Sequence, residues 1–289
     1  MKKSLYLIPA FLLFVFLNSS AQVTVVEDSV FASSINTTTK FYVILPEGYS
    51  QGTDSFPSVY LLHGYSGNYT NWVKLTGLLT YLENYHFIVV TPDAQNSWYS
   101  NSIVTQNMNY EDLIVKDLIP FIDHKYRTIR DRKDRAIAGL SMGGYGAAKF
   151  GLKYPDLFFF AGCLSPAIQY PAGLEDSVLI ARRSKASIQS AQAMFGKTRI
   201  PYWDSNDIFI LAHRIDSTKA PFFYIGFGSQ DGIPGLITQS HQLADIFRQR
   251  EIPFEFHEAK GRHEWKVWDR EIKIVLQRIN EIISGKQEP

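Results

Sequence analysis

The sequence predicts a mostly parallel α/β sheet of about eight strands, flanked by helices. Short apolar segments typical of buried strands alternate with helix-forming segments along most of the 289 residues. Before that alternation begins, residues 23–32 and 38–45 each alternate apolar and polar side chains, which predicts an antiparallel pair at the sheet edge. At residues 134–154 an apolar strand passes directly into a helix at Ser141, as expected where strands and helices alternate.

The remaining strands are short and apolar, and we expect them at residues 59–63, 87–91, 135–140, 158–164, 222–227 and 254–258. Helices are expected between and after them, at residues 70–83, 110–126, 145–154, 236–250 and 264–283. Pro120 lies inside the second helix and should kink it, because proline lacks the N–H that the helix needs. Residues 165–214 interrupt the alternation with prolines, glycines and short helical pieces, which predicts a small cap inserted over one end of the sheet.

The N-terminal residues have the three parts of a secretory signal peptide: a cationic start, an apolar centre and small residues before a cleavage point. We expect residues 1–21 to be removed after Ala21, leaving a domain at 22–289 that is secreted or periplasmic. The apolar run at 5–17 is shorter than the roughly 20 residues that cross a membrane, so no permanent anchor is expected. A net charge of +1 argues against a nucleic-acid partner. The sequence does not predict an oligomeric state.

Gly139, Ser141 and Gly143 match G-x-S-x-G, the pattern of a nucleophile elbow. In this turn a strand changes so sharply into a helix that the serine is held in a strained conformation with its hydroxyl exposed. Glycine on either side removes the Cβ atoms that would collide across the turn. The helix that follows places unpaired N–H groups beside the reacting atom. The sequence therefore predicts that Ser141 is a nucleophile.

A serine nucleophile needs a histidine base and an acid that orients the base. Of the seven histidines, His263 follows the strand at 254–258 and precedes the last helix, at the same end of the sheet as Ser141. Asp231 follows the strand at 222–227 at that end. The order Ser141, Asp231, His263 is that of α/β-hydrolases. If Asp231 were not the acid, Asp204 or Asp207 would be the next candidates.

An oxyanion hole needs two backbone N–H groups, one of them from the residue after the nucleophile. Met142 is expected to supply the first, and Tyr65, in the glycine-rich loop after the strand at 59–63, the second. His63 is expected to brace this loop instead of acting as a base. No cysteine cluster, H-E-x-x-H motif or closely spaced histidine pair is present, so we expect neither a metal nor another cofactor.

These residues resemble the α/β-hydrolase "putative esterase" group, which includes esterase D, tributyrin esterases, family 1 carbohydrate esterases acting on feruloyl and acetylxylan esters, and mycolyltransferases. The resemblance rests on motifs at residues 61–67, 96–102, 139–144, 228–231 and 261–265. Relatives usually have glycine where this chain has Arg262, a departure that leaves His263 in place. The resemblance implies a serine esterase that works through an acyl-enzyme.

Export and this resemblance together predict hydrolysis of short acyl or hydroxycinnamoyl esters, of small molecules or of polysaccharide. Glutathione thioesters are cytosolic and fit an exported protein less well. Trp98 and Tyr99, in the loop after the strand at 87–91, are expected to wall the substrate site. Two alternatives stay open: an acyltransferase of the mycolyltransferase type using the same three residues, and a carbohydrate-binding relative that has lost activity.

Overall fold

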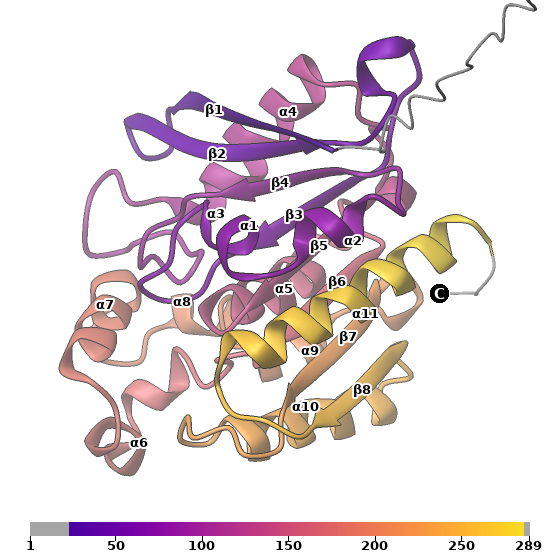
Figure 1. Cartoon of the computed structure of the whole chain (residues 1–289). Coiled ribbons are helices and arrows are strands. Elements are labelled where there is room, and N and C mark those ends of the chain that lie inside the picture. Colours follow the sequence, from indigo (N-terminus) through magenta and orange to yellow (C-terminus); the bar gives the residue numbers. More distant parts are fainter. Residues whose placement is uncertain (1–22, 286–289) are drawn as a thin grey trace, which may run out of the picture.

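The computed structural model describes residues 23–285, which form an eight-stranded sheet with helices on both faces (Figure 1). The strands are β1 (Thr24–Ala32), β2 (Thr37–Leu45), β3 (Ser58–Leu62), β4 (Ile88–Pro92), β5 (Arg135–Leu140), β6 (Phe160–Leu164), β7 (Phe222–Gly228) and β8 (Phe254–Ala259). Their order in the sheet is β1-β2-β4-β3-β5-β6-β7-β8. Strands β1 and β2 pair antiparallel to each other, β2 pairs antiparallel to β4, and all other pairs are parallel. The predicted α/β-hydrolase fold is confirmed; the predicted signal peptide at 1–21 lies outside the described residues.

The two kinds of strand pattern in the sequence correspond to two environments. Every residue of β3, β4, β5, β6 and β7 is buried, because helices cover both faces of these strands. In contrast, β1 lies at the sheet edge, where exposed and partly buried residues alternate. The continuous apolar sequences and the alternating pair therefore indicate how many faces of each strand are buried.

Helices cover the sheet in two layers. On one face α5 (Met142–Lys153), α9 (Ile208–Arg214) and α10 (Leu236–Gln249) contribute to one core cluster. On the other face α1 (Asn71–Leu75), α2 (Leu78–Leu82) and α11 (Trp265–Ile283) contribute to a second cluster. Figure 1 shows α11 crossing in front of the sheet. None of the helices within residues 23–285 combines the length and the apolar character needed to cross a bilayer.

The prediction of one continuous helix at 70–83 is wrong in one respect, because the structure has two helices there, α1 and α2, separated by Thr76 and Gly77. Thr76 adopts an extended conformation there, and the N–H of Gly77 donates to Asp269 Oδ1 on α11 at 2.7 Å. The Leu78 N–H donates to the Thr76 hydroxyl. A tertiary contact with α11 therefore replaces the helical hydrogen bonds, which local sequence does not reveal.

The kink expected at Pro120 takes the form of a widened turn. The segment consists of α3 (Tyr110–Asp112), the π-helical turn η2 (Leu113–Leu118) and α4 (Ile119–Lys125). The N–H of Ile119 donates to the carbonyl of Ile114, five residues back. Since proline has no N–H and its ring crowds the carbonyl four residues earlier, the wider turn accommodates it.

The segment between β6 and β7 contains α6 (Ser177–Ala181), α7 (Lys185–Phe195), α8 (Pro201–Asp204) and α9. Helices α6 and α7 lie away from the sheet, at the lower left of Figure 1. Helix α9 packs against α5 and α10 and so belongs to a helical layer. That residues 165–214 act together as a cap stays a prediction.

Candidate active site

The turn from β5 into α5 holds Ser141 in an unusual backbone conformation. Its φ is 54° and its ψ is −112°, a region that costs a non-glycine residue roughly 1–3 kcal/mol. Neighbouring hydrogen bonds hold it there: the Ser141 N–H donates to the Leu164 carbonyl at 2.8 Å, and the Ser141 carbonyl accepts from Tyr145 and Ala167. The strand β6 and the first turn of α5 thus fix the serine from both sides.

The two glycines of the motif are required by close approaches of backbone to backbone. A Cβ atom on Gly139 would lie 2.5 Å from the carbonyl oxygen of Gly143, and one on Gly143 would lie 2.4 Å from that of Leu62. Helix α5 starts directly above β3 and β5, so any side chain at these positions would push it away. This contact is the physical reason for G-x-S-x-G in this chain.

Ser141, His263 and Asp231 form one hydrogen-bonded chain. His263 Nε2 lies 2.9 Å from Ser141 Oγ, and His263 Nδ1 lies 2.7 Å from Asp231 Oδ2. The side chain of Asp231 is fully buried, and its other oxygen accepts from the Ile233 N–H at 2.9 Å. Because a carboxylate only accepts, Nδ1 carries the proton and Nε2 is left to accept the serine proton. Three loops that follow different strands bring these groups together.

The loop after β3 is braced by His63. Its Nδ1–H donates to the Gly64 carbonyl at 2.8 Å, and its Nε2 accepts from the Ala94 N–H at 3.0 Å. Burial lowers the pKa of this imidazole, opposed by the Gly64 carbonyl and the Asp93 carboxylate. His63 therefore uses both ring nitrogens to join two loops and has none available for proton transfer.

The oxyanion hole expected from the N–H groups of Met142 and Tyr65 stays a prediction, and the structure shows what surrounds each group. Met142 is the first residue of α5, a position whose N–H has no partner within the helix. In the part of the chain that the structure describes, the N–H of Tyr65 has no acceptor, while the adjacent Ser66 N–H is bound to Asn96 Oδ1. Tyr65 and Ser141 both line the same cavity.

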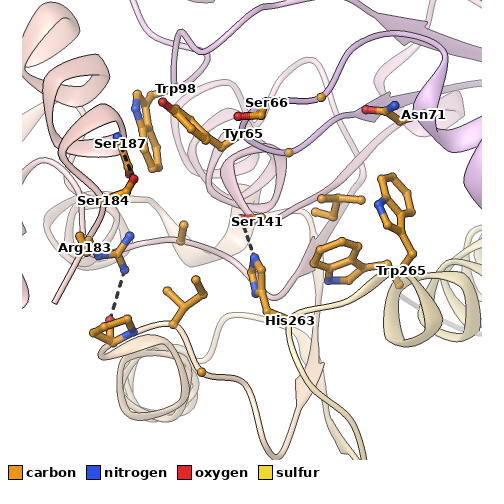
Figure 2. Close-up of a pocket in the computed structure, with 18 of the residues that line it drawn as sticks. Tyr65, Ser66, Asn71, Trp98, Ser141, Arg183, Ser184, Ser187, His263 and Trp265 are labelled. Atoms are coloured by element: carbon orange, nitrogen blue, oxygen red, sulfur yellow. Dashed lines mark hydrogen bonds between the residues drawn. The ribbon is translucent and has the colours of Figure 1, made fainter.

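This cavity has a volume of about 580 Å³, within the usual range for small-molecule sites. Figure 2 shows Ser141 and His263 between two walls: Trp98, Arg183 and Ser184 on one side and Trp265 with Asn71 on the other. Trp98 packs edge-on against Tyr170 with ring centroids 4.4 Å apart, and its Nε1–H donates to Ser190 Oγ on α7. Helix α7 thus fixes the Trp98 ring at the cavity wall.

Tyr99, which we expected to wall the site, does not line the cavity. It is fully buried, and its hydroxyl donates to the His63 carbonyl at 3.0 Å. Both residues have a positive φ, 54° at Trp98 and 48° at Tyr99, in a turn that directs only the Trp98 side chain to the cavity. The expectation for Tyr99 is corrected to a supporting contact beneath the loop after β3.

The aromatic neighbour of the base is Trp268, whose ring packs edge-on against His263 at a centroid distance of 5.0 Å. Trp265, which is nearer to His263 in the sequence, lines the cavity and packs against Trp72 and Trp268 without stacking on the base. The two tryptophans are three positions apart on α11, and periodicity alone did not show which one turns toward His263.

Lys149, which sequence reasoning missed, joins α5 to α3 through a buried ion pair and to the loop that contains Trp98 through hydrogen bonds. Lys149 Nζ donates to Glu111 Oε2 at 2.9 Å, to the Tyr99 carbonyl at 2.6 Å and to Ser100 Oγ at 2.7 Å. Burial lowers the pKa of Lys149 to about 8. A lysine within G-x-S-x-G-x-x-G-A-A-K, in the buried helix after the elbow, was the available signal.

No group of three or more histidine, cysteine or carboxylate side chains is arranged to hold a metal ion within residues 23–285. Cys163 is buried in β6, and burial raises the pKa of its thiol, so it is not a reactive nucleophile.

Comparison with known proteins agrees with this geometry. Residues 32–278 match the protein family described as "Putative esterase". An acetyl esterase of Caldicellulosiruptor saccharolyticus is 26% identical over 234 residues, covering 80% of this chain and 85% of that protein. An endo-1,4-beta-xylanase/feruloyl esterase of Xylanibacter ruminicola is 31% identical over 147 residues, covering 46% of this chain and 20% of that protein. A solved ferulic acid esterase structure superposes with a TM-score of 0.75 at 24% identity, covering 91% of this chain and 99% of the other.

The chain therefore belongs to the putative esterase family of α/β-hydrolases. It is a serine carboxylic ester hydrolase.

Proposed function

We propose that this hydrolase is an exported enzyme that removes short acyl or hydroxycinnamoyl groups from polysaccharide or its fragments, through an acyl-enzyme on Ser141. The observation that carries the proposal is the Ser141–His263–Asp231 chain, with contacts of 2.9 and 2.7 Å, opening into an aromatic-walled cavity of about 580 Å³. Two similar proteins, one named an acetyl esterase and the other an endo-1,4-beta-xylanase/feruloyl esterase, support this substrate class. The signal-like residues 1–21 support export.

The proposed mechanism assigns a defined part of the reaction to each of these residues. His263 Nε2 removes the proton of Ser141 as the Oγ atom attacks the ester carbonyl. The N–H groups of Met142 and Tyr65 would bind the negative oxygen that forms. His263 then gives its proton to the departing alcohol, and Asp231 stabilises the imidazolium between these steps. Water then attacks the acyl-enzyme with the same proton transfers through His263, and the free acid is released.

The mechanism is tested by labelling with a fluorophosphonate and by turnover of p-nitrophenyl acetate. The wild-type protein should gain the mass of one phosphonyl group on the peptide containing Ser141, and Ser141→Ala should gain none. If both proteins hydrolyse p-nitrophenyl acetate at the same rate, the assigned nucleophile is wrong.

The substrate class is tested with methyl ferulate, feruloylated arabinoxylan fragments and acetylated xylan, following release of ferulate and acetate by chromatography. We expect release from at least one polysaccharide substrate, with kcat/KM above that for p-nitrophenyl butyrate. If the acyl group appears on an added sugar acceptor in place of free acid, the enzyme is a transferase. Turnover of p-nitrophenyl esters without release from any sugar ester would contradict the polysaccharide assignment.

A further inference from the structure

The charged side chains on the wall of the cavity are cationic. Arg182 and Arg183, which follow α6, both line it together with Ser184 and Ser187. No aspartate or glutamate is among the described residues that line the cavity. The negative charge of Asp231 lies behind His263 and is engaged by it. A substrate thus meets a positively charged wall on the side away from Trp265 (Figure 2).

Arg183 is held in place, but most of its hydrogen-bonding capacity is unused. One terminal nitrogen donates to the Pro234 carbonyl at 3.2 Å, and the guanidinium lies 5.2 Å from the centre of the Tyr170 ring. Arg183 takes part in none of the ion pairs found among the described residues. Its Nε atom is buried and has no hydrogen-bond partner there. A guanidinium offers five N–H donors in a fork that fits a carboxylate.

The surroundings of Arg183 contain a second unpartnered polar group. Tyr170 is only 2% exposed, and its hydroxyl makes no hydrogen bond of normal geometry among residues 23–285, although it lies close enough to Arg183 to favour the charged guanidinium. Burial lowers the pKa of the Arg183 guanidinium, opposed by Tyr170 and by the charge of Asp231. Placing a partly buried cation without a counter-ion is unfavourable, so an anion bound there would offset the cost.

We propose that Arg183 makes this cavity selective for esters that carry a carboxylate away from the scissile bond, on either the acyl or the alcohol part. The inference rests on the proposed hydrolase function and specifies its substrate class. In a polysaccharide, a uronate close to the acylated sugar would supply the charge on the alcohol side. The carboxylate would accept hydrogen bonds from the free edge of the guanidinium, and the Pro234 carbonyl would keep that edge turned toward the cavity.

The test compares esters of nearly equal size that differ in charge. On the alcohol side the pair is 3-acetoxybenzoate and 3-acetoxybenzamide; on the acyl side it is monomethyl adipate and the methyl ester of adipamic acid. Hydrolysis is followed by pH-stat for the wild type, Arg183→Gln and Arg183→Lys. Lys185→Gln is the matched control, because it removes one positive charge from an exposed position nearby that does not line the cavity.

We expect the wild type to prefer the anionic member of at least one pair, and the pair that shows it identifies the side. Arg183→Gln should lower the anionic-to-neutral ratio of kcat/KM by roughly tenfold to a hundredfold, the size expected for charge-assisted hydrogen bonds. Arg183→Lys should restore part of the ratio, and Lys185→Gln should leave it within about twofold.

A purely structural role for Arg183 would lower kcat/KM equally for both members of each pair, and that result would overturn the proposal. So would a wild-type preference for the neutral ester in both pairs, or no hydrolysis of the acids while p-nitrophenyl acetate is cleaved. Failure of the hydrolase function itself would show differently, as an absence of p-nitrophenyl acetate turnover and of Ser141 labelling.

Discussion

Replacing Glu111 by glutamine should remove a pH-dependent part of the stability of this protein. Glu111 has a 3% exposed side chain and pairs with Lys149 at 2.9 Å and with Lys153 at 2.6 Å, and it also accepts from the Tyr154 hydroxyl. Burial alone would raise the pKa of its carboxyl, but the two ammonium groups and the hydrogen bonds outweigh burial and lower the pKa from 4.5 to about 2.

The size and sign of the effect follow from that pKa. A carboxyl group with a depressed pKa in the folded state stabilises the fold above its ordinary pKa, and this contribution is lost as the pH falls from about 4.5 toward 2. At about 1.4 kcal/mol per pKa unit, the contribution at pH 7 is at most about 3 kcal/mol. Breaking a buried ion pair by removing one partner typically costs about 3–5 kcal/mol, which agrees in magnitude.

Urea unfolding followed by tryptophan fluorescence at pH 7, 5, 4 and 3 measures the difference in unfolding free energy. Glu111→Gln should be about 3 kcal/mol less stable than the wild type at pH 7, and the difference should shrink as the pH falls. The control is Asp112→Asn, because Asp112 pairs with the solvent-exposed Lys116 and should contribute less than about 1 kcal/mol. A difference between wild type and Glu111→Gln that is the same at pH 7 and pH 3 would refute the electrostatic reasoning.

Four further results are expected. Ser141→Ala and His263→Ala should each reduce p-nitrophenyl acetate turnover to a similar residual rate, and the double variant should be hardly slower, because the two residues act as a unit. Asp231→Asn should lower kcat by about 10⁴-fold, because the asparagine would favour the wrong tautomer of His263. An unchanged kcat would show that another carboxylate orients His263. Gly143→Ala should yield little folded protein, measured by circular dichroism, because its Cβ would lie 2.4 Å from a carbonyl oxygen. Trp98→Ala should lower the unfolding free energy by about 3–5 kcal/mol, since the ring is 2% exposed; a change below 1 kcal/mol in urea would contradict its burial.

Much of the fold was predictable because two kinds of residue pattern reflect burial directly. The continuous apolar runs of β3 to β7 and the alternation in β1 result from how many faces of each strand are covered. The boundaries were less predictable where distant side chains intervene. The break after α1 depends on Asp269, which is far along the sequence and reaches Gly77 from α11.

The sequence by itself determined which three residues could act together. Ser141, Asp231 and His263 each follow a strand of a parallel sheet, and the carboxyl ends of parallel strands share one edge, so their proximity follows from topology. Glycines at 139 and 143 marked the turn because only they allow α5 to start so close to β3.

Only the tertiary structure decided what surrounds those residues. Tyr99 faces the interior while Trp98 faces the cavity, and Trp268 instead of Trp265 packs on His263. Arg183 reaches the site from a segment without regular periodicity, placed by the Pro234 carbonyl and the Tyr170 ring. The physical reason is that the apolar pattern of a strand or helix shows which of its faces is buried. The wall of a cavity is built largely by side chains from loops, and the positions of these loops depend on packing between distant segments.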